Sequence, residues 1–245
     1  MIDLEVDSLF LYFGDDYVIN DKITLKQPSI GQIADYGEAE YFSMIHNLTA
    51  IPSDIKSILW DQMELDWTTV EDFQLFQMFS QTMTPDKTGI IFGDLDFSKM
   101  RPYLSKQNDE VVLADKESGV IIDNLIYMRM MFFLRKLHNI TPKREKAGSK
   151  RARQAMIDED RRNRELNKDK PFRSYLLPLI SAVKVKQGYT RDYIRNMGLF
   201  EFFDDLSRIQ VIDSANHLLN GMYCGMADLS KIDKKEFNWL RPIND

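Results

Sequence analysis

The stretch FRSYLLPLISAVKVKQGYTRDYIRNMGLFEFFDDLSRIQVIDSANHLL, residues 172–219, decides the fold class of this chain. Apolar residues three, four and seven positions apart lie on one face of a helix. That spacing links Phe202, Phe203, Leu206 and Ile209. Ser214 has the side chain of an N-cap, and a second helix is expected to follow it. The stretch therefore predicts a helical C-terminal region.

The end of the chain carries further helix signals. Gly221 is placed where a helix could end. Asp233 and Glu236 have the spacing of a capping box, which predicts a short helix after Asp233. That helix would bury Phe237 and Trp239 against the rest of the protein.

Working outward, the first third of the chain reads as a hairpin followed by short helices. SLFLYF and VINDKITLK flank the turn-forming Gly14-Asp15-Asp16, so a β-hairpin is expected over residues 8–26. Capping residues then mark successive helix starts. These starts lie at Ser29 with Gln32, at Glu38, at Pro52 and at Thr68 with Glu71.

The middle of the chain predicts a second hairpin and one apolar helix. Residues 110–113 and 120–123 read as strands joined by ADKESG, with Gly119 near the turn. An apolar helix follows and ends near His138. The predicted fold class is therefore mainly α with a small antiparallel β element (α+β), a multi-helix globular protein.

Residues 143–173 form a charged segment with twelve Lys or Arg and six Asp or Glu. Thr141 and Pro142 are a natural N-cap and first helical residue in front of it. Such a segment is either a solvated helix with charge pairs or a mobile linker. It divides the predicted chain into an N-terminal α+β region (1–140), a charged helix or linker (141–170) and a C-terminal helical region (171–245).

Composition narrows the functional classes. A net charge of −6 and a pI near 5.2 argue against general affinity for nucleic acids or anionic membranes. A single cysteine, Cys224, excludes an intramolecular disulfide and suits a reducing cytoplasm. The acidic start MIDLEVDSLF does not resemble a signal peptide. The apolar run 120–137 carries charges that make it too polar to span a bilayer.

Candidate chemistry is sparse. Asp94 and Asp96 could ligate a cation, but the pair is better explained as a turn. The three histidines occur singly, without metal-ligand spacing, at positions 46, 138 and 217. Cys224 is expected to be a buried or semi-buried, inert thiol. We therefore predict no catalytic residue, cofactor or metal, and a protein that is not an enzyme.

Several blocks of the sequence resemble a protein family of tailed phages and prophages of Gram-positive bacteria. The blocks are residues 176–212 (LLPLISAVKVKQGYTRDYIRNMGLFEFFDDLSRIQVI), 218–240 (LLNGMYCGMADLSKIDKKEFNWL), 27–61 (QPSIGQIADYGEAEYFSMIHNLTAIPSDIKSILWD) and 90–97 (IIFGDLDF). That family is encoded just ahead of the tape-measure gene and is interpreted as a tail assembly chaperone or minor tail component.

The resemblance implies a chaperone in the host bacterial cytoplasm whose partners are the tape-measure protein and, in addition, the tail tube protein. Such a protein needs an apolar, adaptable surface. The candidate partner-binding residues are Met128, Met131, Phe202 and Met222, and on the charged segment Lys150, Arg151, Arg161 and Arg162. Two alternatives stay open: a structural minor tail or head-completion component, and a nucleic-acid-associated protein that uses residues 143–173. Self-association into a homo-oligomer also stays open, and no membrane partner is expected.

Overall fold

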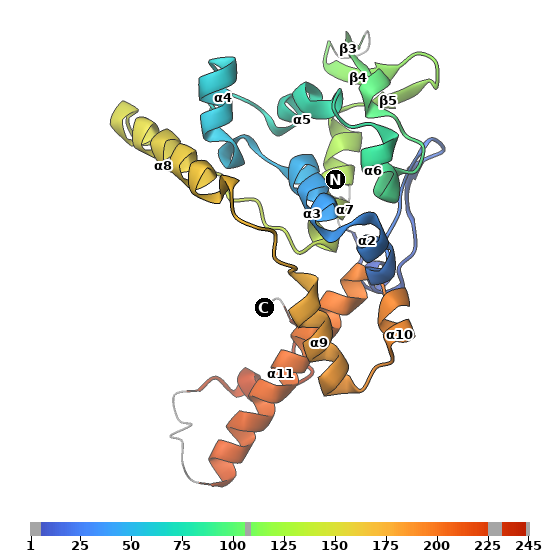
Figure 1. Cartoon of the computed structure of the whole chain (residues 1–245), viewed down its shortest axis with the longest axis vertical. Coiled ribbons are helices and arrows are strands. Elements are labelled where there is room, and N and C mark those ends of the chain that lie inside the picture. Colours follow the sequence, from blue (N-terminus) through green and yellow to red (C-terminus); the bar gives the residue numbers. More distant parts are fainter. Residues whose placement is uncertain (1–5, 106–108, 225–231, 244–245) are drawn as a thin grey trace.

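A computed structural model describes residues 6–105, 109–224 and 232–243. It is mainly helical and carries two small antiparallel sheets, which confirms the predicted fold class. The helices and both sheets of residues 6–137 form a body, from which two projections extend (Figure 1). One projection is the charged helix α8 (Lys150–Lys168), and the other is built from the last third of the chain.

The start of the chain differs from the predicted hairpin. SLFLYF forms a helix, α1 (Ser8–Phe13), because the side chain of Asp7 accepts a hydrogen bond from the amide of Leu9 and Gly14 ends the helix at φ 75°. The hairpin is shorter and lies entirely downstream. It pairs β1 (Tyr17–Asn20) with β2 (Ile23–Leu25), and the side chain of Asn20 accepts hydrogen bonds from two turn amides.

The helix starts at Ser29 and Glu38 are confirmed. Ser29 and Gln32 form a reciprocal capping box at the start of α2 (Ile30–Tyr36), and α3 (Glu38–Thr49) begins directly after Gly37. Pro52 opens a 3₁₀ turn, η1 (Pro52–Asp54), and α4 (Lys56–Met63) follows it.

The start predicted at Thr68 is wrong, and α5 begins at Asp72 (Asp72–Ser80). The side chain of Asp66 accepts hydrogen bonds from both the amide and the hydroxyl of Thr68. This local turn competes with a helix at Thr68. Glu71, the residue three positions later, becomes the N-cap instead.

The middle of the chain contains one helix and one strand that the sequence pattern did not predict. They are α6 (Pro85–Phe92) and β3 (Arg101–Leu104). The predicted strands appear as β4 (Val111–Asp115) and β5 (Val120–Ile122), in a sheet of order β3-β4-β5. Asp96 accepts a hydrogen bond from the amide of Ser98 at the start of η2 (Phe97–Lys99), which is the predicted turn role.

The core of the body surrounds α7 (Asn124–Leu137). Asp123 caps this helix by accepting a hydrogen bond from the amide of Ile126. Six of its side chains are buried, namely Tyr127, Met130, Met131, Phe133, Leu134 and Leu137. The apolar cluster around them extends to Leu199 and Phe202, so the body and the last third of the chain share one core.

The charged segment is helical only from Lys150, and the helix start predicted at Thr141-Pro142 is wrong. The segment around Glu145 has an irregular conformation, because contacts with the body hold it. The carboxylate of Glu145 pairs with Lys56 at 2.6 Å, and the carbonyl of Glu145 accepts a hydrogen bond from the indole of Trp67. Ser149 is the N-cap of α8. The helix packs against α4, where Ile157 is fully buried in a second, smaller apolar cluster.

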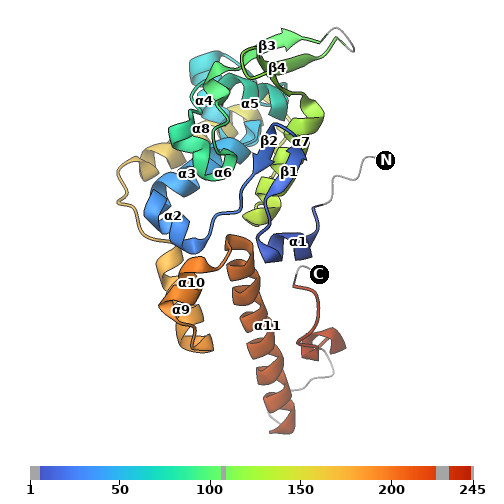
Figure 2. The same cartoon turned by 90° about the vertical axis from the view of Figure 1, so that its right-hand side faces the viewer.

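The last third of the chain forms a C-terminal arm made of α9 (Leu176–Gln187), α10 (Arg191–Asn196), α11 (Leu199–Tyr223) and η4 (Lys234–Phe237). Figure 2 shows the arm extending away from the body, with α1 beside the start of α11. The break predicted at Ser214 is wrong, because α11 runs through it. Amides inside a helix already have backbone partners, so Ser214 has no cap to make.

Three side chains near the C-terminus are more exposed than predicted. Trp239 is 50% exposed, Phe237 is half-buried, and the thiol of Cys224 is exposed rather than buried. The segment after η4 is held mainly through its backbone, since Arg208 donates hydrogen bonds to the carbonyls of Trp239 and Arg241. Its aromatic rings therefore stay at the surface.

The arm meets the body at a tight junction between α2 and α10. The amide of Ile30 donates to the carbonyl of Met197, and Arg195 pairs with Asp35 at 2.8 Å. A Cβ atom at Gly31 would lie 2.7 Å from the carbonyl oxygen of Arg195. Glycine is therefore the residue that lets the two backbones approach this closely.

A second attachment holds the start of α9. The carboxylate of Glu38, on α3, accepts hydrogen bonds from the hydroxyl of Ser174 and from the amides of Tyr175 and Leu176. A carboxylate at a helix N-terminus accepts hydrogen bonds from amides that have no intrahelical partner. Its negative charge also interacts favourably with the positive end of the helix dipole. The body thus supplies the cap of a helix in the arm.

Candidate partner-binding groove

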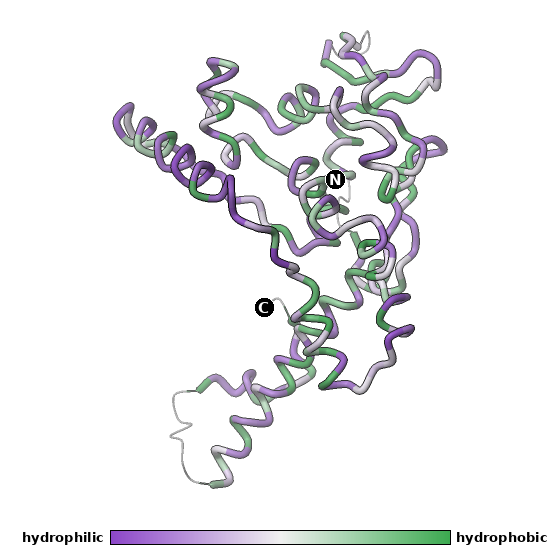
Figure 3. The backbone as a smooth tube through the Cα atoms, in the orientation of Figure 1, coloured by the Kyte–Doolittle hydropathy of each residue, from purple (hydrophilic) through white to green (hydrophobic). Residues whose placement is uncertain are grey.

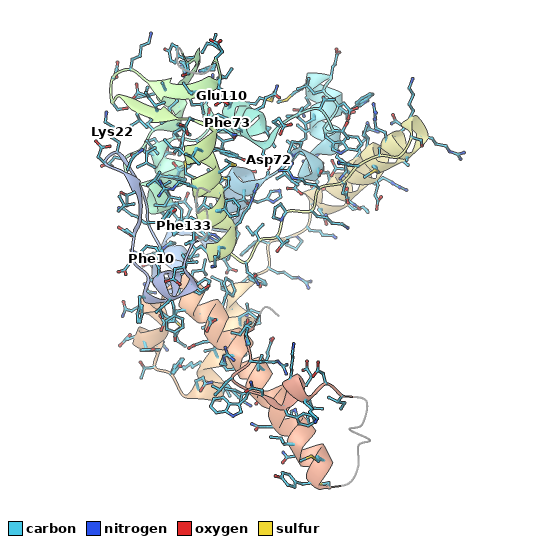
Figure 4. All side chains as sticks on the ribbon, turned by 180° about the vertical axis from the view of Figure 1, so that it is seen from behind. Phe10, Lys22, Asp72, Phe73, Glu110 and Phe133 are labelled. Atoms are coloured by element: carbon cyan, nitrogen blue, oxygen red, sulfur yellow. The ribbon has the colours of Figure 1, made fainter. Side chains whose placement is uncertain are left out.

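A groove of about 750 Å³ lies between α5, α7 and the start of β4; we call it the α5–α7 groove. The two helices are held side by side by the ring of Tyr127, which packs against Phe73 at 5.1 Å and Phe76 at 5.2 Å. Figure 4 labels Asp72, Phe73 and Glu110, which line the groove from α5 and from the segment before β4. Its volume is many times the ~30 Å³ of a water molecule.

The α7 wall of the groove carries apolar side chains at helical spacing. Met131 and Phe132 follow Met128 by three and four positions, and all three side chains line the same cavity. Their burial is graded: Met131 is 1% exposed, Met128 is half-buried and Phe132 is 49% exposed. Methionine side chains are flexible and polarizable, so this wall can adapt to the shape of an occupant.

The opposite end of the groove is polar and incompletely paired. Asp72 pairs with Arg144 at 2.7 Å, and lies 3.7 Å from Arg135. Within the described residues, four buried side-chain atoms have no hydrogen-bond partner, and three of them lie at this end of the groove: Oδ1 of Asp72, the hydroxyl of Tyr127 and Nε of Arg135. Buried polar atoms are nearly always paired, because an unpaired one costs about 1–3 kcal/mol.

The hydroxyl of Tyr127 stays protonated at neutral pH. Burial, and next to it the charge of Asp72, raise its pKa to about 12. The unpaired atoms therefore comprise two donors, on Tyr127 and Arg135, and an acceptor on Asp72. All three atoms are buried, so they lie behind the surface of the groove rather than on it.

Of the four apolar candidate residues, Met128 and Met131 line this groove together. Phe202 is fully buried in the core at the root of the arm and is not presented on the surface. Met131 is also almost fully buried and forms the floor rather than an open surface. Met222 is 44% exposed near the end of α11, in a different part of the molecule.

Arg161 is largely occupied by the protein's own carboxylates. Its guanidinium donates to both oxygens of Asp61, at 2.6 and 3.0 Å, and to Asp158 at 2.7 Å. These hydrogen bonds lower the pKa of Asp61. Neighbouring arginines of α8 are similarly paired, Arg153 with Asp66 and Arg164 with Asp160.

The other three basic candidates lie on exposed parts of α8. Lys150, Arg151 and Arg162 are exposed, and none has an ion pair within the described part of the chain. Five of the twelve basic residues of segment 143–173 form ion pairs with the protein's own carboxylates, so its cationic surface is smaller than the sequence indicates. A phosphate backbone would need several such contacts.

The groove contains residues that sequence reasoning missed. Asp72, Tyr127, Phe132 and Arg135 were not candidates. Arg135 had one usable signal, since it is a charged residue near the end of an otherwise apolar helix. Asp72 had none, because its partners Arg135 and Arg144 are more than sixty positions away in the sequence.

His138 is a buried residue with both ring nitrogens at hydrogen-bond distance from a partner. Its Nε2 lies 2.7 Å from the hydroxyl of Tyr41 and its Nδ1 lies 2.7 Å from the carbonyl of Leu134. Burial lowers its pKa to about 4, so the ring is neutral near pH 7. Over residues 6–105, 109–224 and 232–243, no three His, Cys, Asp or Glu side chains are grouped as a metal site requires. No helix in these ranges combines the length and apolarity needed to cross a bilayer.

Comparison with known protein families gives a match to the C-terminal part of the chain. Residues 167–244, which begin in the last turn of α8 and contain the C-terminal arm, match the family model of the YomV second domain. No curated protein and no solved structure matches the chain significantly. The match points to a prophage-related protein without assigning an activity. The α5–α7 groove lies outside the matched residues.

Proposed function

We propose that this protein is a non-enzymatic tail assembly chaperone that holds an apolar helical segment of a phage tape-measure protein in the α5–α7 groove. The observation that carries the proposal is the groove itself, with Met128 and the half-exposed Phe132 on one wall and the ion pair of Asp72 and Arg144 at one end. Amphipathic helices commonly bind in apolar grooves of this kind, and methionine-rich walls suit partners of varied sequence.

The chemistry of the groove restricts its occupant. One face of a helix would pack apolar side chains on Phe73, Met128 and Phe132. Asp72 would repel a carboxylate and Arg135 would repel a cation, so a neutral group fits best.

The phage partner and the location come from resemblance, and the YomV match supports a prophage origin. A chaperone of this class works in the host bacterial cytoplasm and keeps the tape-measure protein soluble until the tail tube protein polymerises around it. It must then leave, so finished particles should contain little of this chain.

The test is co-expression with the tape-measure protein encoded beside it. The wild-type chain should raise the solubility of that protein and co-purify with it. A Met128→Lys, Phe132→Ser double variant should lose both effects while keeping its thermal unfolding curve. Val18→Lys is the matched control, because Val18 is a 60% exposed apolar residue on β1, outside the groove. If the groove variant and the control bind equally well, the groove is not the binding site.

Salt separates this mechanism from a charge-driven one. Binding through the groove should persist at about half-molar salt, where charges are screened within a few ångströms. Replacing Lys150, Arg151 and Arg162 by Gln should leave binding unchanged. Loss of binding in that variant, together with loss at modest salt, would instead identify α8 as the functional surface.

A second candidate is a permanent structural component of the tail or head. The exposed apolar face of α9 favours it, because Leu177 is 66% and Val185 82% exposed, and such faces are typical of lasting interfaces. Quantitative mass spectrometry of purified particles distinguishes the two. A stoichiometric amount of this chain supports the structural component, and a trace supports the chaperone.

A further inference from the structure

Helix α9 carries apolar residues around most of its circumference, with Lys184 and Lys186 among them, yet the described structure covers one side of it. Leu176 and Val183 are buried toward α11, with Leu179 and Ile180 partly buried beside them. On the opposite side Leu177, Pro178, Ser181, Ala182 and Val185 are all exposed. Figure 3 shows α9 as a largely hydrophobic segment of the tube on the open side of the arm. A helix that is apolar all round is normally buried all round.

The exposed face is symmetric about its middle. Leu177, Ser181 and Val185 follow one another at intervals of four residues and form a single ridge of the helix surface. The small residue Ser181 lies at the centre, and one apolar residue lies at equal distance on each side. If a second α9 packs antiparallel on this ridge, each Leu177 meets the Val185 of the other copy. Ser181 then meets Ser181, where the small side chains allow close approach.

Charges at the two ends of α9 are complementary in the same arrangement. Lys184 lies near the C-terminal end, where the neighbouring Lys186 is already paired with Asp213 at 2.7 Å, and the carboxylate of Glu38 lies at the N-terminal end. An antiparallel pair places the basic end of each helix beside the acidic end of the other, and opposes the two helix dipoles. A parallel pair would bring the lysines of the two copies together.

We propose that two copies of this chain associate through α9, packed antiparallel about a two-fold axis beside Ser181. The contact is isologous, so the same residues of both copies form it. It is separate from the α5–α7 groove, and a dimer would present two grooves. An association of this kind holds whether or not the groove binds a tape-measure protein.

The first experiment measures the mass of the full-length wild-type chain by sedimentation equilibrium from micromolar to millimolar concentration. A monomer–dimer equilibrium is expected, and a monomer throughout would overturn the proposal. Leu177→Lys and Val185→Glu should each weaken dimerisation by roughly a hundredfold, since each disrupts two central contacts across the axis. Both positions are exposed in the single chain, so circular dichroism should show unchanged folding. Undiminished dimerisation of the folded variants would also overturn the proposal.

The second experiment tests the antiparallel register by mixing the two variants. In an antiparallel heterodimer Lys at 177 faces Glu at 185 in one contact, and Val185 faces Leu177 in the other. Equimolar mixing of Leu177→Lys with Val185→Glu should therefore restore dimers that neither variant forms alone. A parallel pair, or a face that binds another partner, gives no such rescue, and its absence would refute the antiparallel interface.

Discussion

Helices α7 and α9 are both apolar and of similar length, 14 and 12 residues, but their surroundings differ. Helix α7 buries six side chains and contacts α3, β1 and β5, whereas α9 buries two and contacts α10 and α11. Apolar composition therefore does not tell how much of a helix is covered within one chain. The buried side chains of α7 therefore stabilise the body, whereas the side chains of α9 leave an exposed apolar surface on the arm.

The largest expected effect is the loss of a core ring from α7. Phe133 is fully buried and stacks on Tyr17, with ring centres 5.0 Å apart (Figure 4). Phe133→Ala should lower the free energy of unfolding by about 3–5 kcal/mol, from lost burial and the cavity left behind. Val185→Ala on α9 should change it by less than about 0.5 kcal/mol. Urea denaturation of both variants measures the contrast, and equal losses would contradict it.

The C-terminal end of α7 should make stability depend on pH. The pKa of His138 is lowered to about 4 in the folded chain from an ordinary value of 6.5, because its ring is buried. Its contribution is present above pH 6.5 and is lost as the pH falls toward 4, since only the unfolded state binds the proton. The loss should approach about 3 kcal/mol, at 1.36 kcal/mol per pKa unit.

The matched variant is His138→Gln, which is expected to be less stable at pH 7 and to have a flatter profile between pH 6.5 and 4. Chemical denaturation at a series of pH values gives both profiles. If wild type and variant show the same slope in that window, His138 is not the group responsible.

Removing the cap at the N-terminal end of α9 should lower the free energy of unfolding by a smaller amount. Glu38→Ala removes the carboxylate that accepts the amides of Tyr175 and Leu176, and helix caps contribute about 1 kcal/mol. Hydrogen exchange of these amides should speed up, while exchange in α7 stays slow. Glu38→Gln keeps one acceptor oxygen and should lie between wild type and Glu38→Ala. Unchanged exchange at the start of α9 in Glu38→Ala would show that the cap does not hold the arm.

The smallest effect is expected at the end of the arm. Trp239 is half exposed and is held through its carbonyl rather than its ring, so Trp239→Ala should cost less than about 1 kcal/mol. Burial of the ring would have raised this to about 3 kcal/mol. Thermal unfolding decides between the two values, and a large loss would mean that the ring is covered in solution.

Helix starts were predictable where the cap is local. Ser29 and Gln32 are three residues apart, so their capping box can be recognised in the sequence. SLFLYF shows the limit, because its composition suits a strand and only the Asp7 and Gly14 caps make it a helix. At Thr68 the competing hydrogen bonds, which Thr68 donates to the Asp66 carboxylate, were equally local, but they favour a turn rather than a helix.

The candidate site was less predictable because its parts are distant in sequence. Met128 and Met131 were recognised from their place in an apolar helix. The pairing of Asp72 with Arg144 depends on how the chain returns past α5, and no local pattern encodes it. The charged segment gave a similar difficulty: Arg161 looks free in the sequence, but its partner Asp61 is a hundred residues away.

The close approach of Gly31 to Arg195 has a mechanical consequence. Helix α11 has 25 residues and starts just after this junction, so it is about 37 Å long at 1.5 Å per residue. A tilt of about 5° at the root of such a helix moves its tip by roughly 3 Å. Gly31 therefore lies at the point about which the arm would tilt. A displacement of one backbone there by the width of a methyl group would change the direction of the whole arm.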